Sequence, residues 1–385
     1  MRLAIITSHP IQYYAPVFKL LNQHKKLDVK VFYTLGESGK NQYDPGFDQK
    51  ISWDIPLLDG YDYQFQKNTS KNPGSNHFWG IINPDLIKEI KFWKADAILV
   101  YGWAYHAHLK AMWYFKNKIP VYFRGDSTLL NRKSSLKNSI KNLLLTLVYR
   151  HTDHAFYVGK NSKAYFEKFG LKNNQLTFAP HTIDNDRFAK DYTTEASALR
   201  QKIGVKSAEI LILFAGKLEP VKNPELLLNA FEKLNQANTH LLFAGNGPLE
   251  KQLKAKKELL KTASQIHFID FQNQSAMPGI YQACDLFCLP SKSETWGLAV
   301  NEAMACWKAV LVSDQVGCAA DLVFEEKNGA IFQSRNEQDL VQKLQKLTQH
   351  KTLLAQFGAS SFNIIQSWNF AVSVEAIQQK ILSHA

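Results

Sequence analysis

The sequence has few cysteines and no long apolar runs. Its four cysteines are Cys284, Cys288, Cys306 and Cys318, and they lack the paired spacing of a zinc site. No apolar run approaches the roughly 18 residues that a membrane-spanning helix needs, and residues 3–6 are too few for a secretory signal core. We therefore expect free thiols and a cytoplasmic location, free or peripheral at the inner face of the membrane.

Acidic residues are scarce in one segment. Residues 101–150 hold nine Lys or Arg and a single acid, Asp126. The formal charge of +12 falls entirely within residues 1–190, whereas residues 191–385 sum to zero. A charge on one half only indicates a partner surface there, for an anionic membrane, an acidic acceptor or a nucleic acid.

Short apolar runs alternate with helical patterns in both halves. The strand-like runs are 3–7, 29–33, 97–101, 121–123, 155–158, 210–215, 240–244, 266–268, 286–289 and 309–312. The helical patterns are 14–22, 107–117, 224–234, 249–262, 302–306 and 337–348. This alternation predicts an α/β chain with two doubly wound, Rossmann-like domains, and ligands at the carboxyl ends of the strands in the cleft between them.

The domain boundary is predicted in a polar stretch without strand character, residues 185–207. We expect a first domain over residues 1–187 and a second over 188–365. Residues 360–385 read as a terminal helical stretch that Trp368 and Phe370 can anchor.

The most informative segment is Ser293–Ala305. It holds two carboxylates, Glu294 and Glu302, with Gly297-Leu298 between them. A glycine at a helix start lets backbone N–H groups approach a phosphate, and carboxylates accept hydrogen bonds from sugar hydroxyls. The alternative is an ordinary helix start with acids near its positive end.

This segment resembles the signature of retaining GT-B glycosyltransferases of family 4 (glycosyl transferases group 1). The resemblance covers about residues 155–330 well and the whole chain at the level of the fold. It implies that Glu294 contacts the transferred sugar and Glu302 the ribose. It also implies a first domain that binds the acceptor, a second that binds the donor, and a terminal helix, 366–385, that packs back on the first.

The loop after residue 215 is the predicted phosphate site. Gly216 allows close approach, and Lys217 and Lys222 offset negative charge on a leaving diphosphate. Lys217 stands where the family usually has Arg, which removes bidentate phosphate recognition there. The alternative is a surface turn with solvated lysines.

Two further segments resemble the donor side of the family. Residues 244–249 form a Gly-x-Gly-Pro turn that we interpret first as structural, with Gly247 also near the nucleotide. Phe271 and Gln272 end a strand where the family holds the base. Trp307 stands where a small residue, often Gly, is usual, and we interpret it as filling a local gap.

The first half offers candidates for the acceptor side or the cleft. His9 and Gln12 follow the first strand, and the alternative is a proline-shaped turn whose His caps a helix. Arg124 and Asp126 follow the strand near 121–123, where Arg124 could stabilise phosphate charge. The alternative for these two is a structural Arg–Asp pair. For His106 and His108 we favour core or cleft packing.

No metal or cofactor is expected. Asp184 and Asp186 mimic a metal-binding D-x-D pair, but they lie in the predicted link, where capping and turn formation are the better interpretation. A UDP-sugar is expected more than a GDP-sugar, as substrate. The family resemblance implies retention, with the leaving phosphate taking the acceptor's proton.

Residues 132–150 form a basic amphipathic pattern. Lys133, Lys137 and Lys141 recur every four residues, and leucines and Ile140 lie between and beyond them. Such a helix can rest on anionic lipid near a lipid-linked acceptor. The alternative is a surface helix with an apolar buried side.

Together these patterns predict a metal-independent, retaining glycosyltransferase. It would move a hexose or N-acetylhexosamine from a nucleotide sugar to a glycan or lipid-linked acceptor, in surface polysaccharide synthesis. One rival is another GT-B enzyme, a nucleotide-sugar epimerase or a phosphorylase. A nucleic-acid-binding protein is a weaker rival, because no recognisable module accompanies the charge. The oligomeric state is left open.

Overall fold

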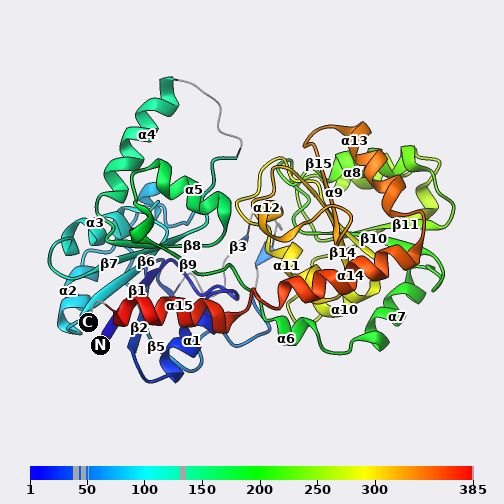
Figure 1. Cartoon of the computed structure of the whole chain (residues 1–385). Helices are drawn as coiled ribbons and strands as arrows, with labels where there is room; N and C mark the ends of the chain where they lie inside the picture. Colours follow the sequence, from blue (N-terminus) through cyan, green and yellow to red (C-terminus); the bar gives the residue numbers. More distant parts are fainter. Residues whose placement is uncertain (38–42, 45–48, 51, 131–135, 384–385) are drawn as a thin grey trace. The chain divides into compact units, whose positions relative to one another are not determined.

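A computed structural model describes residues 1–37, 43–44, 49–50, 52–130 and 136–383 of the chain (Figure 1). The chain divides into two compact units. Unit 1 comprises Met1–Gln42, Ile55–Thr182 and Phe370–Ala385, and unit 2 comprises Tyr43–Asp54 and Ile183–Asn369.

Unit 1 is built on a parallel sheet that has seven strands in the described residues, in the order β5-β2-β1-β6-β7-β8-β9. The strands are β1 (Arg2–Thr7), β2 (Asp28–Tyr33), β5 (Asp62–Phe65), β6 (Ala97–Tyr101), β7 (Val121–Gly125), β8 (His154–Tyr157) and β9 (Leu176–Phe178). Alternate residues of β1 enter different cores, Leu3 and Ile5 on one face and Ala4 and Ile6 on the other. Both faces are therefore buried, which explains the unbroken apolar runs.

Helices cover both faces of this sheet (Figure 1). They are α1 (Ala15–Gln23), α2 (Leu86–Phe92), α3 (His106–Phe115), α4 (Leu136–Tyr149), α5 (Lys160–Lys168) and α15 (Phe370–Leu382). Helix α15 packs against α1, and its Val374, Ile377 and Ile381 are buried in the core that contains Leu3 and Ile5. The last helix of the chain thus completes the first unit.

Unit 2 has a parallel sheet with six strands in the described residues, in the order β12-β11-β10-β13-β14-β15. They are β10 (Ile210–Ala215), β11 (Thr239–Ala244), β12 (Ile266–Ile269), β13 (Leu286–Leu289), β14 (Ala309–Ser313) and β15 (Gly329–Phe332). The helices are α6 (Asn185–Phe188), α7 (Thr193–Lys202), α8 (Pro224–Leu234), α9 (Glu250–Lys257), α10 (Met277–Ala283), α11 (Leu298–Ala305), α12 (Ala319–Leu322), α13 (Glu337–Leu347) and α14 (Lys351–Ile365). A short pair, β3 (Tyr43–Asp44) and β4 (Gln49–Lys50), belongs to the same unit.

The predicted class, two doubly wound parallel sheets with crossover helices, is confirmed. Every predicted strand is present within two residues of its predicted bounds. The predicted link is different in detail, because residues 185–207 hold the helices α6 and α7. The terminal helical stretch is split, since α14 ends at Ile365 and α15 begins at Phe370.

The four cysteines are buried free thiols, as predicted. Burial raises the pKa of Cys284 to about 12 and that of Cys288 further, so neither is ionised near neutral pH. Over the residues that the structure describes, no helix is both long and apolar enough to span a bilayer.

Candidate functional site

The site is built where the strand order of unit 2 reverses. Strand β10 pairs with β11 on one side and with β13 on the other. The chain therefore builds the sheet outward from β10 to β12 and then returns to the other side of β10 with β13. Open α/β sheets bind ligands outside the carboxyl ends of the strands at such a switch point. The loops that follow β10 and β13, residues 216–223 and 290–297, lie at this point and carry the predicted phosphate and sugar contacts.

The loop after β10 is fixed by backbone contacts with the loop after β11. Gly216 N–H donates to Ala244 O at 3.0 Å, and Leu218 N–H donates to Asn246 O at 2.9 Å. A Cβ on Gly247 would stand 2.6–2.8 Å from backbone atoms of Leu218, so this position requires glycine. Gly247 therefore has the structural role in the turn that the sequence predicted first.

Gly216 differs from Gly247. Its φ is +147°, and no other atom lies within 4 Å of the place where its Cβ would be. Lys217, next to it, is half-buried.

Lys222 and Glu294 are 72 residues apart in sequence and form an ion pair and hydrogen bond, Nζ to Oε2. Their side chains are only 23% and 16% exposed, respectively. Partial burial strengthens their attraction relative to a surface pair and orders both groups. The structure thus brings together two residues that the sequence predicted as catalytic from separate motifs.

The backbone of Glu294 is held by the loop after β14. Glu294 N–H donates to Gln315 O at 3.1 Å, and Gly317 N–H donates to Glu294 O at 3.0 Å. A Cβ on Gly317 would stand 1.8 Å from Thr295 O, so only glycine allows this approach. The segment 313–318 therefore positions the predicted sugar-binding loop.

Gly297 precedes helix α11 in a left-handed conformation, with φ at +99°. The helix begins at Leu298, which places Glu302 in its second turn and leaves Glu294 in the loop before it, as the sequence predicted. The helix N-terminus next to Gly297 offers amide donors and a positive dipole end to an anion.

Glu302 is only 4% exposed, and its Oε2 accepts a hydrogen bond of 2.8 Å from the hydroxyl of Tyr281. Nearby, Trp296 Nε1 donates to Asn301 Oδ1 at 3.0 Å. Neither Tyr281 nor Asn301 was predicted from the sequence. Tyr281 lies 21 residues from its partner Glu302, and Asn301 and its partner Trp296 form no known motif. A buried polar residue in an apolar helix, such as Asn301, was the only available signal.

The segment after β12 carries Phe271 and Gln272. The N–H of Phe271 donates to Asn246 Oδ1 at 2.5 Å, and Gln272 Nε2 donates to Asp270 O at 3.1 Å. The Asn246 amide also donates to Glu250 Oε2 at 2.9 Å. Asn246 therefore joins this segment to the glycine turn, a role that the sequence did not reveal.

In unit 1, Arg124 lies at the end of β7 and is 4% exposed. Its guanidinium donates to Ala179 O and Pro180 O, both at 2.8 Å, and lies 5.9 Å from the centre of the Tyr101 ring. These contacts hold the chain as it leaves β9. They favour a structural role for Arg124, through hydrogen bonds to backbone carbonyls.

The other strand-end residues of unit 1 are similarly engaged. Ser8 Oγ and His9 Nδ1 are 3.0 Å apart, and Gln12 is half-buried. The N-cap residue of helix α1 is Tyr14, and its side chain makes no capping hydrogen bond. The Tyr14 ring stacks on His181 at 5.7 Å, a neighbour that the sequence did not predict.

His108 is fully buried, as the packing interpretation predicts. Its Nε2 lies 2.8 Å from Thr34 Oγ1 and its Nδ1 lies 2.7 Å from Gly102 O. Burial lowers the pKa of His108 to about 4, and burial together with Arg124 lowers that of His181 to about 3. Both imidazoles are therefore neutral at physiological pH.

Asp184 caps helix α6, because its Oδ1 accepts a hydrogen bond of 3.0 Å from Arg187 N–H. This is the capping role that the sequence favoured over metal binding. Among the described residues, no group of three His, Cys, Asp or Glu side chains is arranged to hold a metal ion.

Solved structures share this architecture over the whole chain. Anabaena HepE in complex with UDP and glucose matches with a TM-score of 0.76 at 16% identity, covering 100% of both chains. WaaG, a glycosyltransferase involved in lipopolysaccharide biosynthesis, matches with a TM-score of 0.70 at 16% identity, covering 98% of this chain and 99% of that one. The fold is GT-B.

Residues 195–363 match the family model of the glycosyl transferases group 1. The D-inositol 3-phosphate glycosyltransferase of Rhodococcus erythropolis is 27% identical over 224 residues, 56% of this chain and 48% of that protein. An uncharacterized glycosyltransferase of Methanocaldococcus jannaschii is 27% identical over 252 residues, 63% of each protein. The chain thus spans about half the length of the curated relatives that it matches.

Proposed function

We propose that this protein transfers a hexose or N-acetylhexosamine from a nucleoside-diphosphate sugar to a glycan or lipid-linked acceptor. The preferred donor is a UDP-sugar rather than a GDP-sugar. The observation that carries the proposal is the Lys222–Glu294 pair at the switch point of the second sheet. The match of residues 195–363 to glycosyl transferases group 1 and the UDP complexes of HepE support it. In this proposal the reaction retains the anomeric configuration and needs no metal.

The pair explains how donor binding and chemistry are linked. The donor diphosphate lies beside Gly216, where no side chain blocks the backbone, and takes Lys222 and Lys217 as counter-charges. Glu294 is then released to accept hydrogen bonds from hydroxyls of the sugar. Lys222 matters most as the diphosphate departs, because the negative charge on the leaving group grows at that moment.

The remaining donor contacts follow from their places in unit 2. The N-terminus of α11, at Gly297 and Leu298, faces negative charge on the diphosphate. Glu302, held by Tyr281, binds the ribose, and the segment at Phe271 and Gln272 binds the base. On the acceptor side the proposal keeps His9, Gln12 and Asp126. A same-face displacement needs no further base, because the leaving phosphate takes the acceptor's proton.

We further propose that α4 seats unit 1 on an anionic membrane that carries the acceptor. Four aliphatic side chains of α4 are exposed: Ile140 by 66%, Leu143 by 64%, Leu144 by 57% and Leu147 by 41%. They recur at helical spacing and so share one face. This departs from the alternative of an apolar buried side, which accounts only for Leu145, Val148 and Tyr149.

The charge around this face fits an anionic surface. Residues 127–150 contain five Lys or Arg and no acid. Lys141 and Arg150 are exposed, whereas Arg132 and Lys133 lie outside the described residues, as does the side chain of Lys137. An exposed apolar stripe with flanking cations is typical of a helix lying in a membrane interface.

Donor use is tested first. Full-length protein is screened by thermal shift against UDP, GDP, UDP-glucose and UDP-N-acetylglucosamine, with and without EDTA. We expect uridine ligands to raise the melting temperature and EDTA to leave this shift unchanged. If no nucleotide shifts the melting temperature, the proposed donor site is wrong. If EDTA abolishes the shift and added metal restores it, Asp184 and Asp186 become candidate metal ligands again.

Acceptor-dependent release of UDP separates the rivals. A transferase releases UDP only when an acceptor is present, and the anomeric configuration of the product is read by NMR. An epimerase converts the nucleotide sugar without release, and a phosphorylase requires inorganic phosphate. A salt-dependent shift of random DNA without nucleotide binding would favour the nucleic-acid rival.

Membrane seating is tested by sedimentation with anionic and neutral vesicles. Replacing Leu143 and Leu144 together by Gln should lower partitioning to anionic vesicles by about tenfold or more, because buried apolar area is lost. The control is Phe92→Gln, which removes an 86% exposed side chain of α2 in the same unit. If wild-type protein fails to bind anionic vesicles at low salt, this part of the proposal is wrong.

A further inference from the structure

Unit 2 contains a cavity away from the donor loops, which we name the amino-edge cleft. It has a volume of about 700 Å³ and is lined by Arg200, Lys206, Asp285, Trp307, Lys308 and Lys351, among others. Asp285 directly precedes β13, and Lys308 directly precedes β14. Because the strands are parallel, this cleft lies at the amino ends of the strands, the sheet edge opposite to Gly216 and Glu294.

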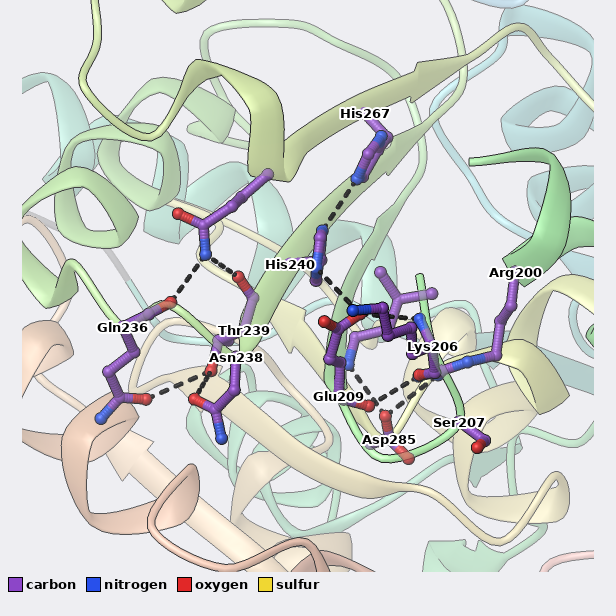
Figure 2. Close-up of polar contacts among 12 residues, drawn as sticks. Arg200, Lys206, Ser207, Glu209, Gln236, Asn238, Thr239, His240, His267 and Asp285 are labelled. Atoms are coloured by element: carbon purple, nitrogen blue, oxygen red, sulfur yellow. Dashed lines mark hydrogen bonds and ion pairs between the residues drawn. The ribbon is translucent and has the colours of Figure 1, made fainter. Parts of the chain in front are cut away.

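The floor of the amino-edge cleft is a fixed cationic network. Arg200 Nη2 donates to Lys206 O at 2.8 Å and to Glu209 O at 2.6 Å, and Nη1 donates to Ala283 O at 2.7 Å. Figure 2 shows Arg200, Lys206, Glu209 and Asp285 gathered at one loop. Within the described part of the chain, Nε of Arg200 is buried and makes no hydrogen bond.

Lys351 adds a second charge to this network. Its Nζ donates to Ser207 O at 2.7 Å and to Glu209 O at 2.8 Å, and lies 3.1 Å from Asp285 Oδ1. The carboxylate of Asp285, 15% exposed, is therefore shared by Lys351 and Arg200. One acid cannot balance both cations.

Two more lysines complete the lining and keep donors for a ligand. Lys308 Nζ donates to Gln282 O at 3.0 Å, which uses one of its three N–H groups. Lys206 is exposed, and its backbone N–H, together with its charge, helps to lower the pKa of Glu209. Counted over the lining residues, four cations face one acid. Glu209 does not line the cleft. Its Oε2 accepts a hydrogen bond from Lys206 N–H and lies 3.4 Å from His240 Nε2.

Trp307 stands at the cleft in an unusual backbone conformation. Its φ is +55°, the left-handed region that favours glycine, and the resemblance leads us to expect a small residue there, often Gly. The ring stacks on Phe362 at 4.2 Å and still leaves the residue 38% exposed. The earlier interpretation, that Trp307 only fills a local gap, leaves this exposure unexplained. Non-glycine residues in this region are often kept at functional sites, and here Trp307 supplies an apolar aromatic wall.

We propose that the amino-edge cleft binds a small phosphorylated metabolite. Lys206 and Lys308 hold the phosphate over the positive floor formed by Arg200 and Lys351. Trp307 packs against the organic part of the ligand. Helix α11 runs from Gly297, at the donor site, to Cys306, in this cleft, so one rigid element joins the two sites. This site is independent of the proposed transfer reaction.

The test is isothermal titration of the full chain in the presence of saturating UDP, so that the donor site is occupied. The probes are inorganic phosphate, glucose 6-phosphate and phenyl phosphate, an aromatic phosphomonoester. We expect saturable binding of the two phosphomonoesters, with phenyl phosphate tighter than inorganic phosphate. Lys308→Gln should weaken both phosphomonoesters by about tenfold, since a charge-assisted hydrogen bond is lost. Lys251→Gln, on α9 outside the lining, is the charge-matched control.

Trp307→Gly separates ligand binding from folding. Glycine accepts the left-handed backbone, so the melting temperature should change little, while phenyl phosphate should lose its advantage over inorganic phosphate. Binding of inorganic phosphate alone, unaffected by Lys308→Gln, would mean an adventitious ion only and would overturn the proposal. Absence of saturable binding up to about 10 mM of any probe would also overturn it. Because UDP is present throughout, failure here leaves the donor site untouched.

Discussion

The two sheets use the polar residues at their carboxyl ends in different ways. In unit 2, Lys222 and Glu294 pair with each other and keep partial exposure. In unit 1, Arg124 and His108 are buried, and hydrogen bonds to backbone carbonyls hold them in place. A charge paired with another side chain can be exchanged with a ligand, whereas a buried polar side chain bonded to the backbone supports the loop itself. The chemistry is therefore expected in unit 2 and the rigidity of the strand ends in unit 1.

The largest expected effect is that of Glu294→Ala. Loss of hydrogen bonds from sugar to a carboxylate costs about 1.5–3 kcal/mol each, so turnover should fall by about a hundredfold or more. The melting temperature should change little, because the loop is held by its backbone. Steady-state kinetics with saturating donor measures this. Glu219→Ala removes an acid from the neighbouring loop as a control, and turnover of the Glu294 variant within about twofold of wild type would reject its role.

Lys222→Ala should lower turnover more than donor affinity. Its charge is needed most when the diphosphate leaves, and loss of one charge-assisted hydrogen bond of about 1.5–3 kcal/mol lowers the rate by about tenfold to a hundredfold. Separate measurement of kcat and the donor Kd distinguishes this from simple binding. Lys217→Ala, in the same loop, is the comparison and should be milder. Equal turnover in the Lys222 variant and wild type would place Lys222 among solvated surface lysines.

Arg124→Gln should act on folding rather than on chemistry. Two buried, charge-assisted hydrogen bonds to Ala179 and Pro180 are lost, which should lower the free energy of unfolding by about 3 kcal/mol. Chemical denaturation measures this, and kinetics are measured on the folded fraction at low temperature. Unchanged stability with a large fall in kcat would restore the catalytic role that the sequence predicted and would break the comparison between the units.

The smallest expected effect is the loss of folding stability in acid that the buried histidines of unit 1 cause. Folded-state pKa values of about 4 for His108 and about 3 for His181 lie below the unfolded value near 6.5, so the unfolded chain binds protons first as pH falls. Their stabilising effect is complete above about pH 6.5 and is lost below it, by about 1.4 kcal/mol per pH unit for each group. In unit 2 the pKa of His267 is also lowered to about 4, by burial and by His240 and Lys257.

Denaturation at pH 7 and pH 5 tests this loss of stability. His108→Gln should flatten the pH dependence of unfolding, while an exposed histidine such as His350→Gln serves as the control. An unchanged slope in the His108 variant would show that the pKa of this imidazole is the same in the folded and unfolded states.

The sequence predicted the sheets well because buried parallel strands are continuous apolar runs. β10 and β13 were placed at their observed bounds. Strand β5, Asp62–Phe65, escaped notice because it lies at a sheet edge and its residues are largely exposed or half-buried. The short strand β15, beginning at Gly329, is likewise at an edge. An edge position alone does not hide a strand, because β12 also lies at an edge and was predicted, and β15 is buried at three of its four residues.

For the site, spacing along the chain predicted Glu294, Gly297 and Glu302 on one helix start, since that geometry is local. The pairing of Lys222 with Glu294 was not predicted, because the two motifs meet only in the fold. The hydrogen bonds of Tyr281 and Asn246 left no local signal, because their partners come from other elements. The roles of the individual site residues stay predictions.

Helix α15 has a consequence for how the chain is made. Residues 370–382 complete the core of unit 1, yet they follow the whole of unit 2 in the sequence. During synthesis the first sheet therefore waits, with the surface that receives Val374, Ile377 and Ile381 uncovered, until the second sheet has been translated. A ribosome-bound chain that stops near Asn369 would expose this apolar strip, and unit 1 should then depend on chaperones until its final helix arrives.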